Sequence, residues 1–477
     1  MPSTKYKVLR VIDTNRAILS VVDKLLFHEK KMAEVTGSIA NVYTVFFHDL
    51  MIHFSGILIQ RESFEHTSSS VIFPYVDKAY ALSPAQLDLL SRNYQQNDNS
   101  LKLGVRETRI LPFMIGNSIP YGYKQDYWLS KLINVLGEYQ RFTKVYLRRL
   151  EYQLADLSDC IGEVCLLHSI KNQDTVRENW LRYISFHATE IRGSTKSRFL
   201  LLGNRQDLQN RKLAVNFLQE EKDVVAFTHG EIASTIFDEP MYRYAERGLC
   251  SVLVEYGERQ KKEEKEGVMV PPQITIYRSS RVALSKYRRS RNIRSIPLSS
   301  AKVLYIPTTY VGNSIYGPYH AYPDSVYSEW HFALTKVLPN VVMKAHPKST
   351  GNYSLPGHVE TRWLDDCIEN YDVLILDYVA TSTAVAMLTD KPVIFFDIGL
   401  RRVAEHFLVA LKKRCHYVFV DINDNLEEQI EDAATSFSIG DRVWSNMHIG
   451  RFCLSSGESR DWRKILAKTL VTKAVIR

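Results

Sequence analysis

The sequence lacks the features that mark secreted, metal-binding and membrane-spanning proteins. Its 477 residues include only six cysteines, with no Cys-x-x-Cys pair and too low a density for a disulfide scaffold. We therefore expect reduced thiols and no zinc site. The first residues carry no apolar signal-peptide core, and no apolar run of 18 or more residues is free of ionisable groups. Residues 42–59 come nearest, but His48, Asp49 and His53 interrupt them. We expect a folded cytoplasmic protein.

The sequence has only a small excess of charge of one sign, and part of that excess lies in one segment. The formal net charge is +8. The cluster from 278 to 294 has basic residues and no nearby acid, and could contact an anionic membrane surface or a glycan, or form a solvated loop between domains. No zinc finger, helix-turn-helix or aromatic-rich platform accompanies it, so we expect no nucleic-acid partner. Contact with the inner face of the cytoplasmic membrane stays open. The basic residues are Arg278, Arg281, Lys286, Arg288, Arg289, Arg291 and Arg294.

Apolar patterns predict an α/β protein with parallel sheets. The length and the 45% hydrophobic content suit two or three domains. Strand-length apolar runs alternate with helix-length segments from residue 198 onward, which predicts one parallel sheet in the N-terminal half. Residues 1–100 mix helical patterns with apolar runs, and we expect an additional mixed region there. Because the basic cluster and residues 296–300 read as a linker, we predict domains at 1–295 and 296–477.

The C-terminal half is organised around residues 340–397. Three short apolar runs, within 340–344, 371–376 and 391–397, are separated by helix-length segments. Such runs are typical of buried parallel strands joined by crossover helices, in a doubly wound sheet. Ligands of these sheets bind beyond the carboxyl ends of the strands. The polar residues collect at those ends: Lys344 and His346 after one strand, and Asp377, Thr381, Ser382 and Thr383 after the next.

The hydroxyl residues 381–383 begin a predicted helix over 381–388. Hydroxyls and free N–H groups at a helix N-terminus favour a phosphate, although Thr381 or Ser382 can simply cap the helix. His346 precedes Pro347, which favours extended backbone, and its imidazole can donate to a second phosphate oxygen. A strand-end histidine can also be purely structural. The combination favours a phosphate site.

These motifs resemble a known family. Lys-Ala-His-Pro-Lys at 344–348, Ala-Thr-Ser-Thr-Ala at 380–384 and Asp-Lys-Pro-Val-Ile-Phe-Phe-Asp at 390–397 look like the donor half of bacterial surface-polysaccharide glycosyltransferases of GT-B architecture. The likeness covers roughly residues 302–421. In members with cytidine donors, such as sialyl-, polysialyl- and Kdo transferases, a His-Pro motif and a Ser/Thr pair bind the donor. Thr-Ser-Thr stands here where Ser-Ser is common.

The resemblance implies two Rossmann-like domains facing a central cleft, with the donor nucleotide and phosphate held by the C-terminal domain. The implied donor-binding residues are Lys344, His346, Lys348, Asp377, Thr381, Ser382 and Thr383. The lysines would balance the charge of the leaving group. No Asp-x-Asp motif lies in a suitable strand-end loop, so we expect no metal and no other cofactor.

A second polar group follows a predicted strand of the N-terminal half. His229, Glu231 and Asp238 come after the apolar run 223–227. Because a transferase needs a general base to deprotonate the acceptor hydroxyl, we predict these three residues as candidates. They could instead cap the following helix and hold the cleft.

The sequence thus predicts a glycosyltransferase that moves a sugar from a nucleotide-activated donor, with CMP implied by the resemblance. The acceptor would be a growing surface polysaccharide or a lipid-linked glycan. Two alternatives stay open. Teichoic-acid glycerophosphotransferases carry a similar His-Pro and would use CDP-glycerol or CDP-ribitol in the same pocket. A non-catalytic protein could also bind a nucleotide or a glycan as a sensor.

Overall fold

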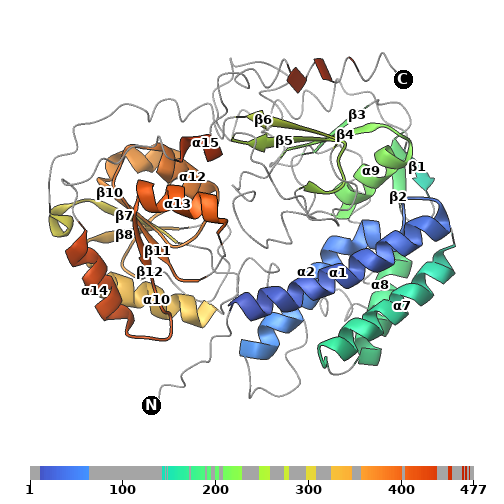
Figure 1. The fold of residues 1–477 in the computed structure, drawn as a ribbon, viewed down its shortest axis with the longest axis horizontal. Coiled ribbons are helices and arrows are strands. Elements are labelled where there is room, and N and C mark those ends of the chain that lie inside the picture. The colour runs from blue at the N-terminus through green and yellow to red at the C-terminus, as the bar shows by residue number, and fades with distance from the viewer. Residues whose placement is uncertain are drawn as a thin grey trace.

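The chain is α/β, with helices and parallel sheets (Figure 1). The computed structural model describes residues 11–63, 142–145, 147, 149–170, 173–188, 191–194, 199–202, 208–227, 247–257, 273–278, 297–307, 324–345, 356–399, 403–437 and 449–453, and near the C-terminus 465, 466, 468, 469 and 472. The predicted domain boundary at 295 lies outside these ranges and stays a prediction.

A helical bundle forms the N-terminal part. Helix α2 is apolar on nearly all sides, which is typical of a buried helix, and it packs against α1 and α7 in the largest apolar core. No helix among the described residues is both long and apolar enough to cross a bilayer. The bundle helices are α1 (Val11–Thr36), α2 (Val42–Ser63), α7 (Leu150–Leu167) and α8 (Gln173–Ala188), beside an antiparallel pair, β1 (Phe142–Val145) with β2 (Ile191–Ser194).

A buried carboxylate ties three helices of this bundle together. Asp156 of α7 accepts hydrogen bonds from Tyr43 Oη of α2 (2.8 Å) and from Lys31 Nζ of α1 (2.5 Å), and it pairs with His28 Nδ1 (2.9 Å). Burial alone would raise the pKa of Asp156, but the hydrogen bonds from Lys31, His28 and Tyr43 outweigh burial and lower it. The ionised carboxylate therefore holds the bundle together.

The N-terminal half also contains a four-stranded sheet, in which every neighbouring pair is parallel. Its alternate residues face two apolar cores. Val224 and Ala226 face the bundle, whereas Val225 and Phe227 face a smaller core that includes Leu466 from the C-terminal tail. The predicted parallel sheet is confirmed. In order it comprises β3 (Phe199–Leu202), β4 (Asp223–Phe227), β5 (Val252–Tyr256) and β6 (Ile274–Arg278), with α9 (Leu208–Gln219) between β3 and β4.

The C-terminal half contains a six-stranded parallel sheet in the order β12-β11-β10-β7-β8-β9. The chain builds outward from β7 in one direction and then from β10 in the other, so the topological switch lies between β7 and β10. The predicted doubly wound order is confirmed. The strands are β7 (Val303–Ile306), β8 (Val341–Lys344), β9 (His358–Glu360), β10 (Val373–Leu376), β11 (Val393–Asp397) and β12 (His416–Phe419).

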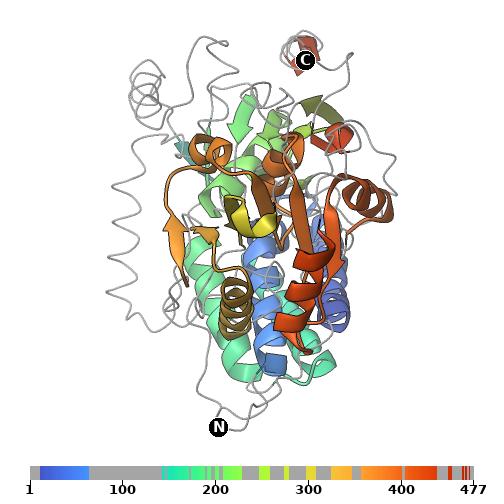
Figure 2. The same ribbon diagram turned by 90° about the vertical axis from the view of Figure 1, so that its left-hand side faces the viewer.

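Helices cover both faces of this sheet. Tyr305 and Ile375 face a core with α10 and α14, whereas Leu304 and Leu376 face a core with α12 and α13. Figure 2 views the molecule from the side of this sheet, so its strands and helices stand in front of the bundle. The bounds are α10 (Asp324–Val337), α11 (Leu364–Cys367), α12 (Thr381–Leu388), α13 (Glu405–Arg414) and α14 (Leu426–Ser436).

A short helix, α15 (Gly450–Cys453), joins the two halves (Figure 1). Phe452 packs edge-on against Phe407, in the first turn of α13, with ring centroids 5.0 Å apart. Gly257 directly follows β5, and a Cβ built there would lie 2.4 Å from the carbonyl oxygen of Phe452. Because α13 begins beyond the carboxyl end of β11, the carboxyl edges of both sheets meet at α15.

Candidate functional site

Asp377 lies at the topological switch and is 2% exposed. Its Oδ2 accepts a hydrogen bond from the hydroxyl of Tyr305 in β7, and Trp330 Nε1 of α10 lies 3.2 Å from the same oxygen. Trp330 Nε1 also donates to the Tyr305 hydroxyl oxygen, at 2.8 Å. The carboxylate therefore ties the end of β10 to β7 and α10, directly before the turn into α12. Its predicted contact with a donor stays a prediction.

The predicted helix 381–388 is confirmed as α12, and Thr383 caps it. The Thr383 hydroxyl donates to the carbonyl oxygen of Tyr378 (2.6 Å) and accepts from the N–H of Ala380 (3.0 Å), in a fully buried position. Capping was predicted as the alternative for Thr381 or Ser382, but the bonds that close this turn are those of Thr383. Ser382 is half-buried in the same turn, and the side chain of Thr381 lies outside the described part. The first N–H groups of a helix have no partner within it and can bind an anion.

The other end of α12 is fixed by Arg414, the last residue of α13. This side chain is fully buried, and its Nε donates to the carbonyl oxygen of Met387 (3.0 Å). Its Nη2 donates to the carbonyl oxygens of Thr389 (2.5 Å) and Lys391 (2.9 Å). A cation at the C-terminus of a helix also complements the helix dipole. With both ends bonded, the N-terminus of α12 is presented from a rigid position.

Lys344 ends β8 on the same face of the sheet as α12. Its neighbour Met343 faces the core of α10, and successive strand residues point to opposite faces. Lys344 is 6% exposed, and its Nζ donates to the carbonyl oxygen of Ala345 at 2.7 Å. Burial lowers the pKa of this ammonium, and the nearby Cys367 and Glu360 oppose that shift. A partly desolvated cation on this face of the sheet fits the predicted role of balancing negative charge.

An ion-pair cluster beside Lys344 was not predicted from the sequence. Glu360 is the register partner of Lys344, and its Oε2 accepts from Arg362 Nη2 (2.5 Å) and from the Tyr371 hydroxyl (3.1 Å). The hydrogen bond from Arg362 lowers the pKa of Glu360 to about 2. Arg362 lies two positions after Glu360, a spacing too common to predict a bond. Because Arg362 already pairs with this carboxylate, Lys344 does not neutralise it alone.

Several predicted residues lie outside the described part of the chain. They are the donor residues His346 and Lys348, the proposed bases His229, Glu231 and Asp238, and the basic residues Arg281, Lys286, Arg288, Arg289, Arg291 and Arg294. Arg278 ends β6, but its side chain is outside too. The structure brings Lys344, Asp377 and the start of α12 to one edge of the six-stranded sheet, and the other assignments stay predictions.

On the N-terminal sheet the structure adds Glu255 near the carboxyl end of β5. Its side chain is 3% exposed, and its register partner in β6 is Tyr277. Sequence patterns did not single out this carboxylate, because it lies inside an apolar run. Glu255 lies two residues before Gly257, so a buried acid lies close to the junction of the two carboxyl edges.

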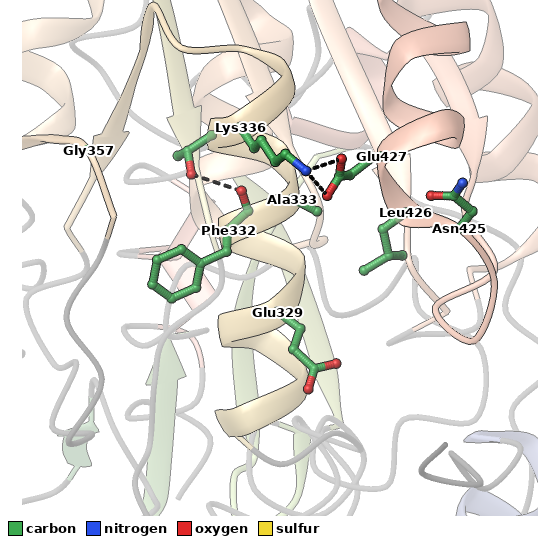
Figure 3. Close-up of a pocket in the computed structure, with 9 residues that line it drawn as sticks. Glu329, Phe332, Ala333, Lys336, Gly357, Asn425, Leu426 and Glu427 are labelled. Atoms are coloured by element: carbon green, nitrogen blue, oxygen red, sulfur yellow. Dashed lines mark hydrogen bonds and ion pairs between the residues drawn. The ribbon is translucent and has the colours of Figure 1, made fainter. Parts of the chain in front are cut away.

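A groove of about 640 Å³ lies elsewhere, between α10 and α14 (Figure 3). An exposed ion pair between Lys336 Nζ and Glu427 Oε2 (2.6 Å) crosses it. None of its lining residues is a predicted site residue, so this groove is distinct from the sheet edge. The lining residues are Glu329, Phe332, Ala333, Thr335, Lys336, Gly357, Asn425, Leu426 and Glu427.

Within the described ranges, no group of three or more His, Cys, Asp or Glu side chains is arranged to hold a metal ion. Comparison of the chain with models of known protein families, with curated proteins and with solved structures finds no match.

Proposed function

We propose that the chain is a nucleotide-sugar glycosyltransferase of GT-B architecture, with two Rossmann-like domains that face a shared cleft. The observation that carries this proposal is the meeting of two carboxyl edges at α15. Parallel sheets bind ligands beyond these edges. Two such edges that face each other can hold a donor on one side and an acceptor on the other.

The donor nucleotide would bind at the C-terminal sheet. The N–H groups at the start of α12, together with the Ser382 hydroxyl, would contact the donor phosphate. Lys344 lies on the same face and would balance the negative charge that builds up on the leaving nucleotide. His346, Lys348 and Thr381 are proposed to complete the site, in accordance with the sequence resemblance. Asp377 would fix the turn that leads into α12.

The acceptor would bind at the N-terminal sheet. Its hydroxyl oxygen forms the new bond to the anomeric carbon, while the bond from that carbon to the phosphate oxygen breaks. The nucleotide leaves with the electron pair, and the hydroxyl proton passes to a general base. His229, Glu231 and Asp238 are the proposed candidates for this base. The acceptor would be a growing surface polysaccharide or a lipid-linked glycan, and the basic cluster 278–294 would contact an anionic membrane surface.

The first test is a panel of nucleotide-activated sugars, with release of the nucleotide measured in the presence of glycan acceptors. We expect release from a CMP-sugar, and we expect His346→Ala to weaken CMP binding by about 1.5–3 kcal/mol, the range for a hydrogen bond to a charged group. Lys336→Ala is the matched control, because it removes a cation of the same half that lies in the separate groove.

The outcomes separate the alternatives. Turnover of CDP-glycerol or CDP-ribitol, without turnover of any sugar donor, would replace the proposal by a phosphotransferase. Nucleotide binding without release in the presence of any acceptor would favour a non-catalytic binding protein. If the folded His346→Ala protein binds CMP like the parent, the assignment of the donor site is wrong.

A further inference from the structure

Two basic side chains contact the same aromatic ring at the junction of the two halves. Arg451 belongs to α15, and its guanidinium lies over the ring of Phe452, 4.8 Å from the centroid. His406 belongs to the first turn of α13, and its ring stacks on the same Phe452 at 5.6 Å, with 25° between the planes. Both side chains are exposed, whereas Phe452 is buried. Both exposed groups are therefore held by one buried aromatic ring.

The electrostatics of this pair are unfavourable without a partner. Partial burial lowers the pKa of His406, and the positive charge of Arg451 lowers it further. Arg451 forms no ion pair with any residue that the structure describes. Glu405 is the one carboxylate in the first turn of α13. Arg451 lies over the Phe452 ring and does not bond to Glu405. A stacked guanidinium keeps its N–H donors available for an anion.

Arg451 and His406 lie between the N-terminal sheet and the start of α12. Gly257, at the carboxyl end of β5, contacts the backbone of Arg451 and Phe452. On the other side, α13 and α12 follow the neighbouring strands β11 and β10 and cover the same face. The first turn of α13 is therefore next to the N-terminus of α12. An anion at Arg451 would lie one strand away from the proposed donor phosphate and next to the N-terminal sheet.

We propose that Arg451 and His406 bind an oxyanion, a phosphate or a carboxylate, of the substrate that lies between the two carboxyl edges. This inference rests on the proposed function, because it assigns a second anionic position to the same cleft. The oxyanion comes either from the donor or from an acidic group of the acceptor. Bidentate bonds from Arg451 would fix its orientation, and protonated His406 would add one charge-assisted hydrogen bond.

The test compares the full chain with Arg451→Gln and His406→Gln. Lys413→Gln is the control, since it removes an exposed cation from the far end of the same helix. The probes are inorganic phosphate, CMP, and an acidic and a neutral oligosaccharide of equal length. We expect Arg451→Gln to weaken binding of the relevant anion at least about tenfold, as loss of a charge-assisted contact should, while the control stays within about twofold.

A second readout follows the titration of His406 by NMR. In the free protein, Arg451→Gln should raise the pKa of His406, because a neighbouring positive charge is removed. A bound anion should raise that pKa in the parent and much less in Arg451→Gln. Since protonated His406 is the form that holds an anion, binding should strengthen as the pH falls through its pKa. A merely structural role for Arg451 would not produce this coupling.

The outcomes also separate this inference from the proposed function. Weaker binding of CMP and phosphate in Arg451→Gln assigns the oxyanion to the donor, and weaker binding of the acidic oligosaccharide alone assigns it to the acceptor. If every probe binds Arg451→Gln like the parent, the inference is overturned, even if His346→Ala abolishes nucleotide binding. If phosphate binding depends on Arg451 but no nucleotide binds, the oxyanion site stands and the proposed function fails.

Discussion

The hydrogen bonds between Tyr305, Trp330 and Asp377 can be tested by removing one oxygen atom. Tyr305→Phe keeps the ring in its fully buried place but deletes the hydroxyl that donates to Asp377. Trp330 Nε1 loses its acceptor at 2.8 Å, although Asp377 Oδ2 stays within 3.2 Å. The change therefore removes one hydrogen bond to a carboxylate and leaves the indole with a longer one.

The expected loss follows from these contacts. A hydrogen bond to a charged group contributes about 1.5–3 kcal/mol, and weakening the indole bond adds a few tenths, so Tyr305→Phe should cost about 2–3 kcal/mol. A domain with a typical stability of about 5–15 kcal/mol stays folded after such a loss. Because Asp377 precedes the turn into α12, we also expect weaker nucleotide binding in this variant.

Tyr417→Phe is the matched control. The Tyr417 hydroxyl of β12 bonds to Asp397 Oδ2 of β11, so it is also a tyrosine–aspartate bond between neighbouring strands at the carboxyl edge. Both of these residues are only half-buried. Solvent can replace the lost hydroxyl there, and we expect a loss of no more than about 1 kcal/mol.

Urea denaturation followed by circular dichroism gives both values, as shifts of the midpoint at an unchanged slope. A double-mutant cycle with Asp377→Asn should give a coupling energy of at least about 1 kcal/mol, because the two residues share one bond. If Tyr305→Phe costs no more than Tyr417→Phe, and the cycle shows no coupling, then this network does not hold the switch point together.

Four further outcomes are expected. Gly257→Ala should destabilise the protein more than Gly37→Ala in thermal melts, because both glycines have positive φ but only Gly257 has a backbone atom, at 2.4 Å, where the Cβ would be; equal melting temperatures would contradict the close contact with α15. Thr383→Val should cost about 1 kcal/mol and Thr383→Ser little, since serine keeps the cap of α12; urea midpoints measure both. Burial lowers the pKa of His53 and of His331 to about 3 and that of His48 well below its usual value. At mildly acidic pH these histidines are therefore protonated in the unfolded chain but neutral in the folded chain. Stability should therefore fall as the pH drops below about 6.5, by up to about 1.4 kcal/mol per pH unit for each of these histidines, and equal stability at pH 7 and pH 5 would refute their burial. The cluster 278–294 should bring the protein to anionic vesicles at low salt, with release as salt rises, and equal sedimentation with neutral vesicles would exclude the charge as the cause.

The parts of the fold that could be predicted are those with strong local patterns. The apolar runs of the C-terminal half became buried strands, and helix α12 begins at Thr381 as its hydroxyl-rich start indicated. Strand β9 was missed because it is only three residues long and lies at the sheet edge, with His358 and Val359 exposed. Residues 42–59 could not be assigned to helix or strand, because a segment that is apolar on all sides shows neither period.

The candidate site was less predictable, because its contacts join distant parts of the chain. The partners of Asp377 lie 72 and 47 residues away in the sequence, so their bonds have no local signal. Thr383 and Ser382 carry the same chemical group, yet the first faces the turn below α12 and the second is half-buried. Only the backbone path of the turn decides which hydroxyl caps the helix and which stays accessible.

The junction at α15 combines a local backbone feature with contacts between distant parts of the chain. A positive φ and a close backbone contact explain why glycine stands at position 257, but the partner of that contact lies almost two hundred residues further along the chain. Phe452 then packs on α13, while Leu466 returns to the core of the N-terminal sheet. The C-terminal segment therefore contacts both halves of the chain. Because α15 contacts both the residue after β5 and the first turn of α13, its packing positions the two carboxyl edges between which the proposed donor and acceptor would bind.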